Sequence, residues 1–176
     1  MQLDNENTLK ALNDFSKYVV KQSRTNLTKG GRNVSKQLYD SIGYDLNVSP
    51  NSFELGFKMQ DYGQFQDLGV RGKTSSSRAP RSPFKFGTGS GAKGGLTNGI
   101  DNWVKRKRIQ FSNRKTGKFM SYENTAFLIR NSIYNKGLKP TMFFSKPFEA
   151  GFINLPDDVI QAYGLDVENF LKYTLK

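Results

Sequence analysis

The sequence predicts an α+β fold: a small antiparallel sheet with a β-hairpin core, packed by several helices, with a long basic Gly/Ser-rich loop. Residues 38–59 alternate apolar and polar side chains on both sides of the turn "SPNS", and residues 8–27 repeat apolar side chains at helical spacing. Residues 71–95 carry glycine, serine and cations without either period. Alternation with a period of two indicates strands, and a 3.6-residue period indicates an amphipathic helix. This mixture of elements is typical of an α+β domain.

The first predicted helix spans residues 8–27. Leu9, Leu12, Phe15 and Val19 recur in it every three or four residues, with polar side chains between them. This spacing places the apolar side chains on one face of a helix. The two glycines of "TKGGRN" are expected to end the helix, because glycine is favoured after helix C-termini.

The β-hairpin is predicted next along the chain. Its two strands meet at the turn of residues 49–52, and their apolar side chains fall on a single face. The apolar positions are Leu38, Ile42, Tyr44, Leu46 and Val48 on the first strand and Phe53, Leu55, Phe57 and Met59 on the second. We therefore expect a hairpin with one buried face.

A helix with a basic end is predicted after the Gly/Ser-rich loop. Leu96, Ile100, Trp103 and Val104 form one helical stripe, and four consecutive cations at residues 105–108 follow. Cations in the last turn also interact favourably with the helix dipole.

Shorter signals predict the remaining elements. These are one or two helical turns at residues 60–70, a basic hairpin tip at 111–121, a helix at 121–137 that ends at Gly137, a buried extended segment at 138–152, a helix that starts near Pro156, and a last short helix around Val167, Phe170 and Leu171.

The composition excludes several kinds of chemistry. The chain has 176 residues, which suits one domain with a buried core. It has no cysteine and no histidine, so disulfides, thiolate or imidazole metal sites and Ser-His catalysis are excluded. No run is long and apolar enough for a membrane span, and the polar start "MQLDNENTLK" resembles neither a signal nor a transit peptide. We expect no cofactor and no membrane partner.

The net charge of +12 is confined to one segment. Residues 71–118 contain 13 Lys or Arg and one acid, Asp101, whereas the other 128 residues hold 14 side chains of each sign. Such a localised excess indicates a face directed at something negative, such as nucleic acid or an acidic protein surface. The candidate contact residues are Arg71, Lys73, Arg78, Arg81, Lys85, Lys93, Lys105, Arg106, Lys107, Arg108, Arg114, Lys115 and Lys118.

Two interpretations of this basic segment stay open. Residues 71–95 form either a solvated loop without a role or, as we prefer, a flexible basic arm that becomes ordered on a partner. Residues 103–118 carry seven cations and either contact phosphates or form a solvated helix end and turn. The chain contains no motif that reads DNA or RNA sequence, so sequence-specific recognition is not expected.

The stretch "GTGSGAKGG", residues 87–95, resembles a phosphate-binding loop only superficially. Ala92 separates the preceding glycine from Lys93, and Gly94 stands where that loop needs a hydroxyl. No hydrophobic strand leads into the stretch. A flexible Gly/Ser loop is the better interpretation.

The carboxylates give no signal for catalysis. Asp157 and Asp158 fit the first turn of a helix, where acidic side chains stabilise the N-terminus. Asp61 and Asp67 flank a short segment that offers no third metal ligand. We therefore expect that the protein is not an enzyme.

Three short motifs resemble a phage protein family, the neck or tail-completion proteins that join head and tail in tailed bacteriophages. "LYDSIGYDL" is similar to the family's Leu-x-x-Ser-Ile motif, and "DYGQFQDLGV" is similar to its Tyr turn with a following Glu-x-Gly-Thr stretch. "PTMFFSKPFEAGF" resembles its aromatic Pro-Phe segment. Asp67 and Val70 depart from the second motif. The matching residues are Leu38, Ser41, Ile42, Tyr62, Gly69, Phe144, Pro147 and Phe148.

The resemblance covers residues 8–70 and 138–152. It implies a single neck-type domain over residues 1–176, with 71–95 as the flexible basic arm and 96–137 as a basic helical insertion. It also implies a structural virion protein that is assembled in the bacterial cytoplasm and forms a ring of 12 or 6 copies at the head–tail interface. Its partners would be the portal or an adjacent neck or tail ring, with DNA in the channel as a further candidate.

A second function stays open on the residues alone. The protein could be a non-specific nucleic-acid-binding protein that uses residues 71–118, since phosphate contacts need charge and not a sequence-reading motif. DNA affinity that falls steeply with salt would favour this alternative, and a ring in electron micrographs would favour the connector.

Overall fold

The chain folds into two compact units in the computed structural model, which describes residues 5–32, 35–49, 52–88 and 95–174. Unit 1 comprises residues 1–60 and 142–176, and unit 2 comprises residues 61–141. Helices and small antiparallel sheets make up both units in these ranges, so the predicted α+β class is confirmed. The chain leaves unit 1 after Gln60 and returns to it at Met142. The prediction of one neck-type domain with an insertion stays a prediction.

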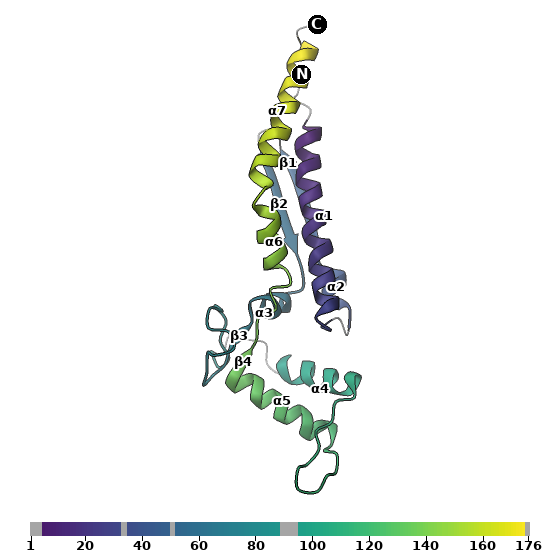
Figure 1. Cartoon of the computed structure of the whole chain (residues 1–176), viewed down its shortest axis with the longest axis vertical. Coiled ribbons are helices and arrows are strands. Elements are labelled where there is room, and N and C mark those ends of the chain that lie inside the picture. Colours follow the sequence, from purple (N-terminus) through teal and green to yellow (C-terminus); the bar gives the residue numbers. More distant parts are fainter. Residues whose placement is uncertain (1–4, 33–34, 50–51, 89–94, 175–176) are drawn as a thin grey trace. The chain divides into compact units, whose positions relative to one another are not determined.

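Unit 1 consists of helices packed on a β-hairpin. Its elements are α1 (Glu6–Lys29), α2 (Gln37–Ser41), β1 (Gly43–Ser49), β2 (Ser52–Lys58), α6 (Ser145–Phe152) and α7 (Leu155–Thr174). Figure 1 shows α1 running beside α6 and α7, with the hairpin alongside them.

Helix α1 confirms the prediction for residues 8–27 and extends it by two residues at each end. Leu12, Phe15, Val19 and Leu27 are buried, so one face of the helix belongs to the core. The helix ends at Lys29, and the following glycines supply the turn.

The predicted hairpin is confirmed, with Gly43 paired to Lys58 and Ser49 paired to Ser52. The two middle residues of the predicted turn lie outside the described residues. On the covered face of the hairpin, the Phe57 ring packs edge-on against Phe15, Phe144 and Phe148, with ring centroids 5.4–6.0 Å apart. Such edge-on aromatic contacts add to the energy of area burial.

The prediction that the first strand begins at Leu38 is wrong, because residues 37–41 form the short helix α2. Leu38 and Ile42 are four residues apart, a spacing that suits one helical face as well as strand alternation. Arg24 favours the turn of helix by donating hydrogen bonds to the carbonyls of Tyr39 at 3.1 Å and Ile42 at 2.9 Å. These carbonyls would otherwise remain unsatisfied at the helix end.

Two further predictions near the C-terminus are wrong. Residues 145–152, expected to be extended, form helix α6, because Pro147 lies in the first turn, where its missing N–H is not needed. The two helices expected after residue 155 are the single helix α7. Ala162 and Asp166, four residues apart, are both buried, so the same face continues through Gly164.

Unit 2 contains α3 (Tyr62–Leu68), β3 (Val70–Arg71), α4 (Gly95–Lys107), α5 (Tyr122–Lys136) and β4 (Gly137–Leu138). Strands β3 and β4 pair antiparallel, and α4 packs on α5. The predicted helices at 60–70, 96–108 and 121–137 are confirmed, as is Gly137 as the residue after α5, with φ +91°. In the part of the chain that the structure describes, no helix is both long and apolar enough to span a membrane.

Candidate partner-binding surfaces

Unit 2 carries the whole net charge of the protein. Residues 61–141 contain 16 Lys or Arg and four Asp or Glu, whereas the residues of unit 1 contain 11 side chains of each sign. The charge excess therefore coincides with a folded unit.

The first group of cations lies on a loop that folds back onto unit 2. Its described members are Arg71, Lys73, Arg78, Arg81 and Lys85. The backbone N–H of Arg71 donates to Phe84 O at 2.8 Å, and the Arg71 carbonyl accepts from Phe86 N at 2.9 Å. The N–H of Lys73 donates to Tyr134 O at 2.8 Å. These bonds close the loop and attach it to the C-terminal end of α5.

Two side chains of this first group have partners inside the unit. Lys73 Nζ lies 5.8 Å from the centroid of the Tyr134 ring, within the range of a cation–π interaction. Arg78 Nη1 donates to Gly137 O at 3.3 Å. The side chains of this group that remain exposed without such a contact are Arg81 and Lys85. A part of the first group thus stabilises its own unit.

The contact role of Lys93 and the flexibility of residues 71–95 before assembly both stay predictions. Lys93 and most of the glycine-rich stretch lie outside the described residues. The loop of residues 71–88 has a hydrogen-bonded form on its own unit, and its motion before assembly was predicted from composition alone.

The second group of cations lies at the end of α4 and on the turn that follows it. The turn is closed by hydrogen bonds from Asn113 N to Lys118 O at 2.9 Å and from Met120 N to Phe111 O at 2.8 Å, which confirms the predicted hairpin tip. The cations of this group are all exposed, and among the described residues none of them forms an ion pair. They are Lys105, Arg106, Lys107, Arg108, Arg114, Lys115 and Lys118.

Helix α5 separates the two groups. The first group attaches at Tyr134, near the C-terminal end of α5. The second group attaches at its N-terminal end, where Phe111 N donates to Thr125 Oγ1 at 3.2 Å. Nine residues of helix span about 14 Å. In the sequence, residues 71–118 form one basic segment, but in the structure their cations lie on two separate surfaces.

The motif residues of unit 1 have packing roles. Leu38 and Ile42 form the buried core with Leu27 and Phe143. Ser41 Oγ donates to Leu38 O at 2.8 Å and accepts from Gln60 N at 3.1 Å, which links α2 to the residues after the hairpin. Among the other motif residues of unit 1, Phe144 and Phe148 pack on the hairpin and Pro147 is buried in α6.

The two motif residues of unit 2, Tyr62 and Gly69, lie in different environments. Tyr62, the first residue of α3, is 37% exposed. Gly69 has φ +72°, and a Cβ atom there would lie 2.5 Å from Leu138 O and 2.7 Å from Pro140 N. Only glycine fits this crossing of two chain segments.

Asp166 has a structural role that the sequence did not reveal. It lies on α7, is 3% exposed, and its two carboxylate oxygens accept four hydrogen bonds of 2.7–3.1 Å from Asn7 and Thr8. Burial alone would raise the pKa of Asp166, but the hydrogen bonds from Thr8 and Asn7 outweigh it and hold the pKa below its ordinary value. Asp166 thereby caps α1, because its acceptors meet the second and third N–H groups of that helix.

An exposed apolar stripe on α7 was also missed. Ile160, Tyr163 and Leu171 are 69%, 47% and 49% exposed, and they lie at helical spacing on one side of the helix together with the half-buried Val167. We call these four residues the α7 stripe. Apolar periodicity alone does not show which face of a helix is covered.

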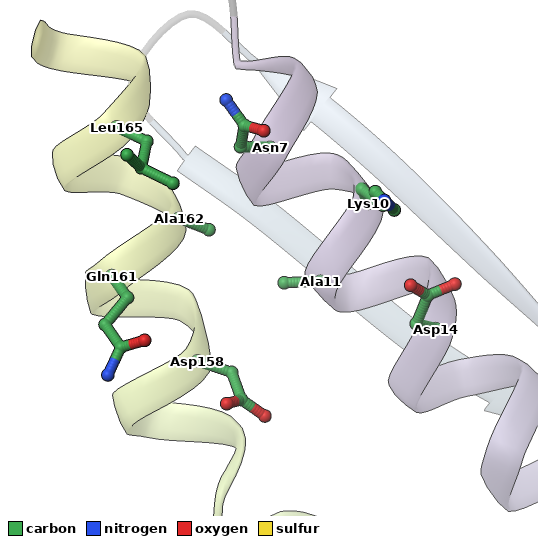
Figure 2. Close-up of a pocket in the computed structure, with 8 residues that line it drawn as sticks. All are labelled: Asn7, Lys10, Ala11, Asp14, Asp158, Gln161, Ala162 and Leu165. Carbon is green, nitrogen blue, oxygen red and sulfur yellow. The ribbon is translucent and has the colours of Figure 1, made fainter.

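A shallow groove between α1 and α7 is smaller than a typical small-molecule site. Figure 2 shows its eight lining residues, among them Lys10, Asp14 and Asp158. Its volume of about 240 Å³ lies below the roughly 300–1,000 Å³ of small-molecule pockets. Within the described ranges, no three Asp or Glu side chains gather as a metal site would need.

Comparison with protein-family models, with curated proteins and with solved structures finds no match to the chain.

Proposed function

We propose that the protein is a structural virion protein that forms an oligomeric ring in the head–tail connector of a tailed phage. In that role it joins portal and tail and leaves a channel for DNA. The observation that carries the proposal is the α7 stripe, a row of apolar side chains that a monomer leaves in contact with water. An apolar surface of this kind is usually covered by a partner.

The residues that carry the family resemblance support the proposal because they stabilise the fold. Leu38, Ile42 and Phe148 hold the core of unit 1, and Gly69 permits a close crossing in unit 2. These are positions that a shared fold would require. A connector needs contact surfaces, and it needs no catalytic group.

A closed ring needs two different contact patches on each subunit. The α7 stripe offers one of them on unit 1. The exposed Arg81 and Lys85 of unit 2 do not complement an apolar patch, so they would face the portal or an adjacent ring and not the neighbouring copy. A portal or neighbouring ring with an acidic surface would complement the charge of unit 2.

Native mass spectrometry and negative-stain microscopy test the ring. We expect 6 or 12 copies for the wild-type protein, and a shift to monomer for Ile160→Lys, because burying the ammonium group in an apolar interface is unfavourable. Asn169→Lys adds the same charge elsewhere on α7 and should leave the ring intact. A wild-type protein that is strictly monomeric and binds neither portal nor tail components would refute the proposal.

The neighbouring genes offer an independent check on the same proposal. We expect a gene for a portal or a major capsid protein close to the gene for this chain.

A further inference from the structure

The second group of cations forms a separate surface together with two aromatic rings. We call it the α4–turn surface and define it by its seven cations with Phe111 and Phe119. Phe119 is 76% exposed and Phe111 is 42% exposed. No acidic residue occurs between Asp101 and Glu123, so nothing in this stretch neutralises the cations.

The turn holds these groups in a defined arrangement. Asn113 closes it by donating from its N–H to Lys118 O and by accepting from Gly117 N at 2.8 Å, and its side chain accepts from Lys115 N at 2.9 Å. Ser112 and Phe119 form a β-bridge. Arg114, Lys115 and Lys118 therefore lie on the turn, the two phenylalanines lie at its base, and the other four cations lie at the end of α4.

Arg108 occupies a position that favours glycine. It follows α4 with φ +53°, while its N–H donates to Lys105 O at 3.2 Å and Ile109 N donates to Val104 O at 3.0 Å. This pair of bonds is the Schellman motif, in which the left-handed residue is usually glycine. An arginine there strains the backbone and adds to the repulsion among cations, so the fold itself gains little from it.

We propose that the α4–turn surface binds a single strand of nucleic acid, with the cations on phosphates and the exposed rings stacked on bases. Lys and Arg bind phosphates without reading base sequence. Exposed aromatic rings beside cations are the arrangement that single-strand-binding proteins use, because unpaired bases offer faces for stacking. An acidic chain without apolar side chains would satisfy the charges and leave the rings in water, and a duplex offers no free base faces along its length.

Fluorescence anisotropy with a labelled oligothymidylate of about 20 nucleotides tests this inference. We expect binding at low salt that weakens steeply as salt rises, with a slope proportional to the number of phosphates contacted. The single strand should bind more tightly than a duplex of equal length. Tighter binding of the duplex, or no binding at about 50 mM salt, would overturn the proposal.

Two variants separate the contributions of charge and stacking. Arg114→Gln with Lys115→Gln should weaken binding about fivefold or more and flatten the salt dependence. Phe119→Ala should weaken single-strand binding about fivefold or more with an unchanged salt dependence. The matched control removes two exposed cations of unit 1, Lys17→Gln with Lys21→Gln, and should bind like the wild type.

Competition with polyglutamate identifies the kind of partner. We expect the oligonucleotide to be displaced far more readily by unlabelled oligothymidylate than by polyglutamate of equal charge. Equal displacement, or full affinity in Phe119→Ala, would assign the surface to an acidic protein and reject the proposal. The inference does not rest on the ring, since a monomer that binds the oligonucleotide would support it while contradicting the connector.

Discussion

The substitution Asp166→Asn tests whether α7 caps α1. One carboxylate oxygen of Asp166 accepts from Thr8 N at 2.9 Å and Thr8 Oγ1 at 2.7 Å, and the other accepts from both nitrogens of Asn7. Asparagine would retain one oxygen and present an amide group to the donors on the other side. Asn5, which precedes α1, makes no capping hydrogen bond with its side chain, so the helix has no local substitute.

The expected loss in the free energy of unfolding is about 2–3 kcal/mol at pH 7. A lost helix cap costs roughly 1 kcal/mol, and hydrogen bonds to a charged group contribute about 1.5–3 kcal/mol. The favourable interaction between the carboxylate and the helix N-terminus adds to these terms, and the easier burial of a neutral amide offsets part of them.

Urea unfolding followed by circular dichroism at 222 nm, together with Trp103 fluorescence, measures this effect. Trp103 is the only tryptophan and lies in unit 2, so a transition that shifts in dichroism alone would place the loss in unit 1. Glu168→Gln is a control on the same helix, because that side chain is exposed and paired with Lys172, and it should change stability little. A loss below about 0.5 kcal/mol for Asp166→Asn would refute the capping role.

The contribution of Asp166 should also depend on pH. Its pKa is lower in the folded protein than in the unfolded chain, so its stabilisation is fully present above about pH 4. It is lost as the pH falls through the lowered folded-state pKa. The stability difference between the wild type and Asp166→Asn should therefore shrink in acid, and a constant difference from pH 7 to pH 2 would contradict this.

Four other substitutions have predicted effects on the stability of unit 2, each measured by urea unfolding with Trp103 fluorescence. Gly69→Ala should cost about 2 kcal/mol or more, because its Cβ would clash with Leu138 O, whereas Gly99→Ala, in the open interior of α4, should stabilise by about 0.5–1 kcal/mol. Arg108→Gly should stabilise unit 2 by about 1 kcal/mol, because glycine adopts the left-handed backbone without strain. The same substitution should weaken oligonucleotide binding. Equal or lower stability would contradict the assigned cap. Ser121→Ala should cost about 1 kcal/mol, because Ser121 Oγ accepts from Asn124 N at 3.1 Å at the start of α5, and an unchanged midpoint would refute that cap.

The parts of the fold that depend on local periodicity could be predicted from the sequence. Helix α1, the hairpin and α5 follow from repeated apolar spacing and from glycines at the ends. The short helix α2 could not be predicted in this way, because Leu38 and Ile42 fit either element and the choice depends on Arg24, a residue on another helix. Residues 145–152 were expected to be extended, although Pro147 is compatible with helix α6 because a proline in the first turn costs no hydrogen bond.

The candidate surfaces show the same division between local and distant information. Composition alone located the charge excess, since the count of Lys and Arg needs no structure. It could not show that Lys73 and Arg78 contact Tyr134 and Gly137, which lie some 60 residues further along the chain. The cap by Asp166 is also invisible in the sequence, because its partners Asn7 and Thr8 belong to the first helix.

The path of the chain through the two units has a consequence for the order of folding. Unit 2 is built from one continuous stretch, so during synthesis it can fold as soon as residue 141 has emerged. Unit 1 cannot be completed until α7 has been made, because the hydrogen bonds of Asp166 to Asn7 and Thr8 span 158 and 159 residues. Closing such a distant contact is slow. Unit 2 would therefore be folded before α6 and α7, the helices that pack on α1, have emerged.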